Sequence, residues 1–172
     1  MSRYRLRGAI FAAWALVVAV ALVAVQGHEQ TLAEGELALL QLAPVDPRSL
    51  MQGDYMALRF AADGELGLLS EAEAKDVETM PSFAHFTLDE QRRADFAGVG
   101  DTPARGRDTI SMRIRRIDGG YSIGPNAFFF QEGTGEQFEA AQWGGFKVAD
   151  DGTALLVSLH DAELQMIGSQ QR

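Results

Sequence analysis

Apolar and polar positions are distributed unevenly along the chain. Residues 8–25 form an uninterrupted apolar run without a charged side chain, GAIFAAWALVVAVALVAV, whereas shorter apolar and alternating segments follow it. At about 1.5 Å of rise per residue, a helix of this length covers roughly 27 Å, which is close to the thickness of a hydrocarbon core. We therefore expect residues 8–25 to form a transmembrane helix that extends through the polar segment 26–34 before Gly35 ends it.

The charges around the apolar run predict its orientation. Arg3, Arg5 and Arg7 precede the run, and the first acidic residue is Glu29. The positive-inside rule therefore predicts a cytoplasmic N-terminus and an extracytoplasmic remainder.

A cleaved signal peptide is the alternative, because such peptides carry an apolar core of about 7–15 residues with a small-x-small cleavage site just after it. Here the run is longer, and Ala19 and Ala21 form such a pattern only inside it. We expect an uncleaved anchor, with residues 1–27 as the tail and anchor and residues 28–172 as an extracytoplasmic domain.

The pattern beyond Gly35 predicts a single, mainly β antiparallel domain of about eight strands with one or two short helices. Alternation and apolar runs bounded by Gly, Pro or Asp indicate the strands. The expected strands are 36–43, 54–61, 82–88, 94–99, 108–117, 121–123, 128–130, 143–149 and 153–159. The Ser70 and Glu73 spacing predicts a helix over residues 70–77, and Thr134 is placed to cap another through residue 141.

Turn residues predict which of these strands pair. Asp118-Gly119 is typical of a type I′ hairpin, Asp150-Asp151-Gly152 of a second hairpin, and residues 89–93 of a third. Ala62-Asp63-Gly64 also indicates a turn. The strand over residues 36–43 is expected to pair with the strand over 54–61.

The segment between these last two strands organises the chain. Pro44 and Pro47 end the first strand because proline cannot donate a ladder hydrogen bond. Gly53 suits a turn that needs positive φ. From Asp54 onward the pattern alternates, and it divides the strand into two faces. One face holds Met56, Leu58 and Phe60, and the other holds Tyr55, Ala57 and Arg59.

Composition narrows the possible functions. The chain has no cysteine, which excludes disulfides, iron–sulfur clusters, thiolate nucleophiles and cysteine zinc sites. Its net charge is −9, and because the three arginines before Gly8 contribute +3, the remainder carries −12. An acidic exported domain argues against nucleic acid and against anionic lipid surfaces as partners.

Two blocks of the sequence resemble the GDYXXLXY family, a group of small bacterial membrane-anchored proteins. The matching residues are Asp46, Pro47, Arg48, Gly53, Asp54, Tyr55, Leu58 and Phe60 in the first block, and Phe128, Phe129, Phe130, Gln131, Glu132 and Gly133 in the second. Phe60 stands where the motif has its final Tyr. The resemblance spans residues 36–168, implies a bacterial inner-membrane location, and implies no established activity. We expect these motif residues to be structural.

Groups that could carry chemistry are few. His28, His85 and His160 show none of the spacings of helix-borne metal ligands, so no metal or cofactor is expected. His160-Asp161 is a candidate cation site or proton shuttle, but we expect a solvated turn after the last long strand instead. Asp46 and Asp54 suit local turn-fixing hydrogen bonds, with Arg48 as an ion-pair partner.

A serine nucleophile is the second chemical candidate. Ser49 precedes a Gly-Asp pair, and Lys75 or Lys147 is the only available lysine base, which requires burial to lower its pKa. The aromatic run at residues 128–130, together with Trp143 and Phe146, indicates either a ligand pocket or ordinary core.

We therefore predict a single-pass membrane protein whose domain is a non-catalytic binding or assembly module. The bilayer contacts residues 8–25, and another integral membrane protein is the candidate partner. The alternative is a membrane-tethered hydrolase that uses Ser49 or an Asp/His pair.

Overall fold

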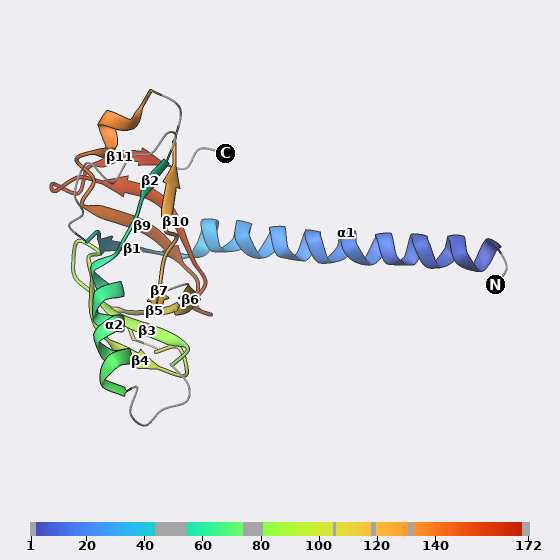
Figure 1. Cartoon of the computed structure of the whole chain (residues 1–172), viewed down its shortest axis with the longest axis horizontal. Helices are drawn as coiled ribbons and strands as arrows, with labels where there is room; N and C mark the ends of the chain where they lie inside the picture. The colour runs from blue at the N-terminus through green and yellow to red at the C-terminus, as the bar shows by residue number, and fades with distance from the viewer. Residues whose placement is uncertain are drawn as a thin grey trace. The chain divides into compact units, whose positions relative to one another are not determined.

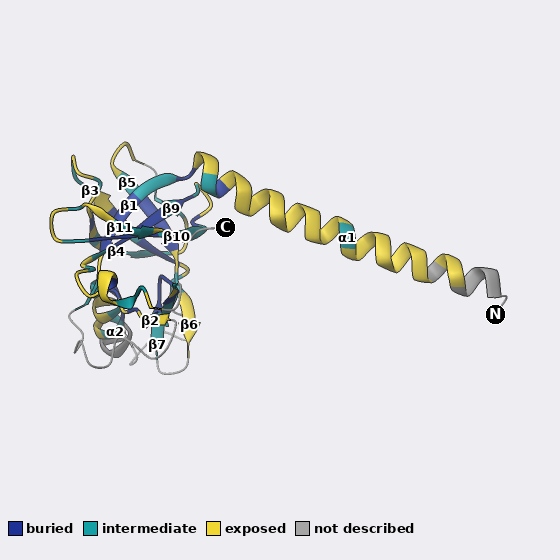
Figure 2. Cartoon of the chain, turned by 90° about the horizontal axis from the view of Figure 1, so that it is seen from above, coloured by how far each residue is buried: buried dark blue, intermediate teal, exposed yellow. Residues whose placement is uncertain are grey.

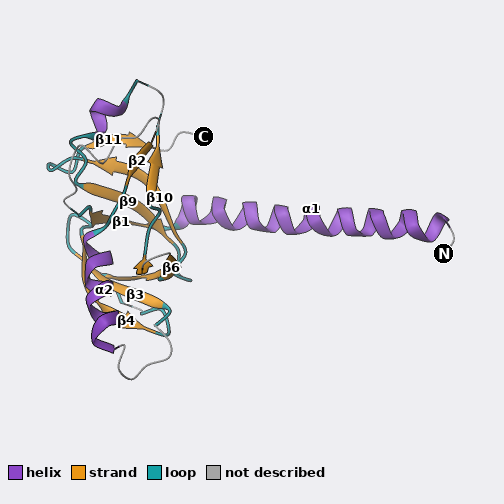
Figure 3. Cartoon of the chain, viewed as in Figure 1, coloured by secondary structure: helices purple, strands orange, loops and turns teal. Residues whose placement is uncertain are grey.

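The computed structural model describes residues 3–43, 55–73, 81–104, 106–117, 120–130 and 133–169, and these form two compact units that divide after Glu34 (Figure 1). The described elements are α1 (Arg3–Glu34), β1 (Glu36–Gln41), β2 (Tyr55–Ala57), α2 (Ala61–Glu73), β3 (Phe83–Leu88), β4 (Ala94–Gly100), β5 (Thr109–Arg113), β6 (Arg115–Ile117), β7 (Gly120–Ser122), β8 (Ala127–Phe129), the 3-10 helix η2 (Gly135–Phe138), β9 (Trp143–Val148), β10 (Ala154–His160) and β11 (Met166–Ser169). The unit from residue 35 onward is mainly β, as predicted, but its described part holds eleven strands rather than about eight (Figure 3).

The first unit is the continuous helix α1, which contains the predicted apolar run and the polar segment after it. Its large apolar side chains are exposed: Ile10, Phe11, Trp14, Leu16, Val17, Val20, Leu22, Val23 and Val25 (Figure 2). Such a surface is unfavourable in water and suits a hydrocarbon environment. Among the described helices, this one is long and apolar enough to span a membrane. The helix ends at Glu34, and Gly35 begins the second unit.

The described strands of the second unit form four antiparallel sheets. The largest has the order β1-β9-β10-β11, and the next has the order β4-β3-β5. The pairs β2-β8 and β6-β7 form two short ribbons. The hairpins β3-β4, β6-β7 and β9-β10 agree with the predicted pairings, because each joins two alternating segments across a short polar connection.

The predicted partner of the first strand is wrong. β1 pairs antiparallel with β9, so that Leu39 lies opposite Gly145. In the described part of the chain, the link between this segment and the one after β2 is reduced to an isolated bridge between Leu42 and Phe60, beside which the Ala43 N–H donates to the Arg59 carbonyl at 2.8 Å. β9 lies far along the chain from β1, so turn residues near β1 could not have predicted this pairing. Burial of the apolar side chains of β1 in the core stabilises it.

The predicted turn at residues 62–64 and the predicted start of a helix at Ser70 are also wrong, because both segments belong to α2. Asp63 explains the early start. Its Oδ2 accepts a hydrogen bond from the Phe60 N–H at 3.2 Å, and its Oδ1 accepts one from the Ile123 N–H at 3.1 Å. These bonds, with the fully buried Leu66, outweigh the low helix propensity of the glycines at 64 and 67.

Other elements differ from prediction in length. In the described part of the expected strand 54–61, which begins at Tyr55, only β2 is a strand. The expected strand 108–117 is interrupted at Ile114 and forms β5 and β6. The helix after Thr134 is the short η2, without a capping hydrogen bond from the Thr134 side chain. β11 was not predicted at all. The Asp118-Gly119 turn lies outside the described residues.

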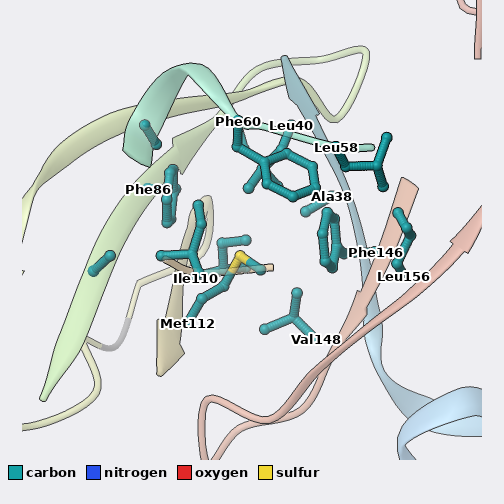
Figure 4. Packing of buried hydrophobic residues seen from close by; sticks show 14 of the residues in the cluster. Ala38, Leu40, Leu58, Phe60, Phe86, Ile110, Met112, Phe146, Val148 and Leu156 are labelled. Atoms are coloured by element: carbon teal, nitrogen blue, oxygen red, sulfur yellow. The ribbon is translucent and has the colours of Figure 1, made fainter. Parts of the chain in front are cut away.

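The core lies between the two larger sheets and beneath α2. Figure 4 shows the Phe60 ring beside the Phe146 ring, with Ile110 and Met112 of β5 in the same cluster. The Phe60 and Phe146 ring centroids are 5.2 Å apart and meet edge to face. The predicted apolar face of the segment after Gly53 is confirmed, since Met56, Leu58 and Phe60 are all buried.

Candidate functional site

The β2-β8 ribbon brings the two motif blocks together. Tyr55 lies opposite Phe129, and Met56 lies opposite Phe128. Because side chains alternate along a strand, Met56 and Phe128 enter the core while Tyr55 and Phe129 point outward. The outward rings are 5.8 Å apart. Residues far apart in the sequence therefore form one two-faced ribbon.

The remaining motif residues divide between the core and the undescribed segments. Leu58 and Phe60 are buried, and Gly133 has a φ of 82°, a backbone conformation that favours glycine. The residues outside the described part of the chain are Asp46, Pro47, Arg48, Gly53, Asp54, Gln131 and Glu132, and with them the candidate nucleophile Ser49 and the candidate base Lys75.

An open cavity of about 630 Å³ lies where β8 approaches η2 and β11. We call it the aromatic groove, and the residues that line it are Phe128, Phe129, Phe130, Thr134, Gln137, Phe138, Met166, Ile167, Gly168 and Ser169. Its volume is within the range typical of ligand sites. Figure 1 shows η2, the orange helix, beside β11.

Phe138 packs against residues of both walls of the groove. It is buried, and its ring centroid lies 5.4 Å from that of Phe128 and 5.1 Å from that of Phe130. A Cβ at Gly168 would approach the Phe138 ring to 2.1 Å, so glycine is required for this ring to lie against β11. The inner wall of the groove is therefore fixed by close packing.

The outer wall of the groove is apolar and exposed. Phe129 is 68% exposed and Met166 is 63% exposed. Glu136 on η2 and Glu139 directly after it are also exposed, on either side of the lining residue Gln137 in the sequence. Among the described residues that line the groove there is no lysine or arginine. The groove thus combines accessible apolar side chains with acidic residues nearby.

The aromatic residues weighed as either a ligand pocket or ordinary core divide between the groove and the core. Residues 128–130 line the groove, but Phe146 packs in the core against Phe60. Trp143 lies on β9 between Gln41 and His160 and does not line the groove. The partners that complete the groove come instead from η2 and β11, which no sequence pattern placed beside β8.

A Ser–His pair, which sequence reasoning missed, lies on β10. A bulge after Leu156 and burial of Leu159 in the core place Ser158 and His160 together on the opposite face. The Ser158 Oγ is 2.9 Å from the His160 Nε2, and the His160 Nδ1 is 3.1 Å from the Leu164 carbonyl oxygen. A carbonyl only accepts, so Nδ1 carries the proton and Nε2 accepts the serine hydroxyl.

This pair has the internal geometry of a nucleophile and base but no access to substrate. Ser158 is 2% exposed and His160 is 7% exposed, and neither lines a described cavity. The prediction that His160 occupies a solvated turn is wrong. Asp161 does occupy the turn, where its Oδ1 accepts N–H bonds from Glu163 and Gln165. His160 and Asp161 therefore bond different partners, and the period-two spacing of Ser158 and His160 was the signal that could have revealed their pair.

A second Ser–His contact joins β3 to β5. The His85 Nδ1 lies 2.9 Å from the Ser111 Oγ, which also accepts the Ala104 N–H at 2.8 Å. Ser111 is buried but borders a cavity of about 330 Å³ that Glu36 and Asp150 also line. No described carboxylate bonds the His85 ring, so the orienting acid of a catalytic triad is missing from the described residues. Ser111 instead ties the loop at Ala104 to the sheet.

Other candidate groups have structural partners. The Lys147 Nζ donates to the Gly35 carbonyl at 2.9 Å, and Glu36 pairs with Arg92. Within the described ranges, no three His, Asp or Glu side chains are placed to hold a metal ion. Burial raises the pKa of Asp63, although N–H bonds from Phe60 and Ile123 oppose that effect. This carboxyl belongs to the first turn of α2 and lines neither of the two described cavities.

Comparison with known proteins agrees with the motif blocks. No curated protein and no solved structure matches the chain. A family model described as GDYXXLXY protein matches residues 17–159, which is well over half of the sequence. The chain belongs to the GDYXXLXY protein family.

Proposed function

We propose that this protein is a membrane-tethered binding module without catalytic activity of its own, and that it binds its partner through the aromatic groove. The groove carries this proposal, because it is an open cavity whose accessible walls are apolar while the Ser–His pair on β10 is buried elsewhere. Exposed aromatic side chains around a concave site are typical of binding surfaces.

The tether supports a location at the membrane. α1 exposes a continuous apolar surface, and three arginines lie in the helix before that surface begins. The proposed arrangement is a bacterial inner-membrane protein with a cytoplasmic N-terminus and an extracytoplasmic domain. The candidate partner is another integral membrane protein, because a tether restricts the domain to encounters near the bilayer.

Site-specific photocrosslinking tests this proposal. A benzophenone amino acid replaces Phe129 in the full-length chain, and in a matched chain it replaces Leu68, which is 70% exposed on α2 and lies outside the groove. After irradiation of bacterial cells, carbonate-washed membranes should retain the chain, since α1 anchors it. We expect an adduct of one discrete added mass from position 129 and none of that mass from position 68.

Three results would contradict the proposal. Identical adducts from both positions would show that the groove has no special role. A crosslink within the chain itself would show that its own residues cover the groove. Absence of any adduct at position 129 in cells that produce the protein from its natural locus would show that the groove meets no partner there.

A further inference from the structure

We propose that the partner segment at the aromatic groove is an extended, basic peptide that pairs with the free edge of β11 as an added β-strand. This inference rests on the proposed function, since it names the chemistry of the partner that the groove binds. It follows from the strand edges, the aromatic wall and the charges around the groove.

β11 presents its backbone to the groove. It is the last strand in the order β1-β9-β10-β11, and within the described residues its only strand partner is β10. A strand that lined a cavity with one face would contribute alternate residues. β11 instead contributes four consecutive residues, Met166 to Ser169, which is the pattern expected when the edge of a strand faces the cavity. An edge of this kind holds unpaired N–H and C=O groups.

The aromatic wall provides positions for the side chains of an added strand. Phe138 and Phe130 form the inner surface, while Phe129 and Met166 extend to solvent. Alternate side chains of an extended peptide can enter such a groove while its backbone bonds β11, and these two contributions give specificity and affinity, respectively. An α-helix uses its backbone N–H groups internally except in its first turn, so it cannot pair along an open strand edge, and the edge favours an extended ligand.

The acidic residues around the groove favour a basic partner segment. Between Ala127 and Ser169 the sequence carries seven acidic residues and a single lysine. That residue, Lys147, bonds the Gly35 carbonyl. Glu136 on η2 and Glu139 directly after it are exposed and adjoin residues that line the groove. A second copy of this acidic chain would bring like charges together, whereas lysine or arginine at the solvent-facing positions of the added strand would be attracted.

A selection from random linear peptides tests the inference. The full-length chain in lipid nanodiscs is the target, and the variant Phe129→Lys in identical nanodiscs removes peptides that bind elsewhere. We expect the recovered peptides to alternate apolar residues with lysine or arginine. For a recovered peptide, N-methylation of the alternate amides that face β11 should weaken binding at least about tenfold, because it removes two or more backbone hydrogen bonds. N-methylation of the other amides is the control.

The outcomes separate this inference from the proposed function. Recovered peptides that are acidic, or that tolerate N-methylation at every amide, would overturn strand addition and leave the groove as a binding site of another kind. Failure to recover any peptide, alongside a discrete crosslink at position 129, would overturn the inference alone. Recovery of no peptide, together with the absence of a discrete crosslink at position 129, would overturn the proposed function as well. A dimer of the chain in the nanodiscs, held through β11, would show that a second copy is the occupant.

Discussion

Gly145→Ala is expected to lower the free energy of unfolding by roughly 1–3 kcal/mol, because it inserts a methyl group into a closely packed polar pair. A Cβ at this position would lie 2.3 Å from the Ser158 Oγ and 3.0 Å from the His160 Nε2. β9 is an internal strand of its sheet, so its backbone has little room to move away. Chemical denaturation of the full-length chain in nanodiscs, followed by tryptophan fluorescence, measures the change.

The double variant Gly145→Ala/Ser158→Ala identifies the cause. Removing the Ser158 hydroxyl relieves the closest contact, so the double variant should be more stable than the sum of the two single effects predicts. If the two effects simply add, the loss in Gly145→Ala comes from another source. Stability equal to the unmodified chain in Gly145→Ala alone would show that Ser158 and His160 are not packed as described.

Asp63→Ala is expected to be the second large loss, at roughly 1–3 kcal/mol for each buried N–H that is left unpaired. The change removes the acceptors of the Phe60 and Ile123 N–H groups, which join the start of α2 to the segment after β7. Asp63→Asn keeps one acceptor oxygen but places an amide donor toward a backbone N–H. Its free energy of unfolding should therefore lie between those of the unmodified chain and Asp63→Ala. An unfolding curve for Asp63→Ala that overlays the unmodified chain would contradict this account of α2.

The stability that Asp63 contributes should also depend on pH. Burial raises its folded-state pKa above the ordinary value of 3.8, which means that folding favours the protonated carboxyl. The advantage of the unmodified chain over Asp63→Ala should therefore be largest below pH 3.8 and decrease as the pH rises through the raised pKa. Unfolding free energies measured from acidic to neutral pH give this difference. An advantage that increases with pH would mean that the N–H bonds outweigh burial.

Local patterns predicted the parts of the fold that local physics determines. The hairpins β3-β4 and β9-β10 each join alternating strands across a polar connection, and the apolar run before Val25 forms one helix. The start of α2 was missed because Asp63, besides accepting the nearby Phe60 N–H, accepts the N–H of Ile123, which lies far along the chain. The β1-β9 pairing was missed for the same reason.

Only one wall of the aromatic groove was predictable from the sequence. The Phe128–Phe130 run was identified from its aromatic residues, and alternation placed Tyr55 on the outward face of its strand. The other wall was not found, because Met166-Ile-Gly-Ser is too short to indicate a strand and only the packing of Phe138 against Gly168 brings it to β8. The spacing of Ser158 and His160 already places them on one face of β10, but the bulge after Leu156, which the sequence does not indicate, decides which face that is.

The central claim is that the aromatic groove binds a partner, and a matched pair of lysine variants tests it most directly. Phe129→Lys and Leu68→Lys each replace a side chain of nearly equal exposure, 68% and 70%, but only the first lies in the groove. The measurement is the yield of the partner identified by crosslinking that co-purifies with each full-length variant. We predict unchanged melting temperatures for both, loss of the partner from Phe129→Lys, and normal recovery with Leu68→Lys. Equal recovery with both folded variants would contradict the claim.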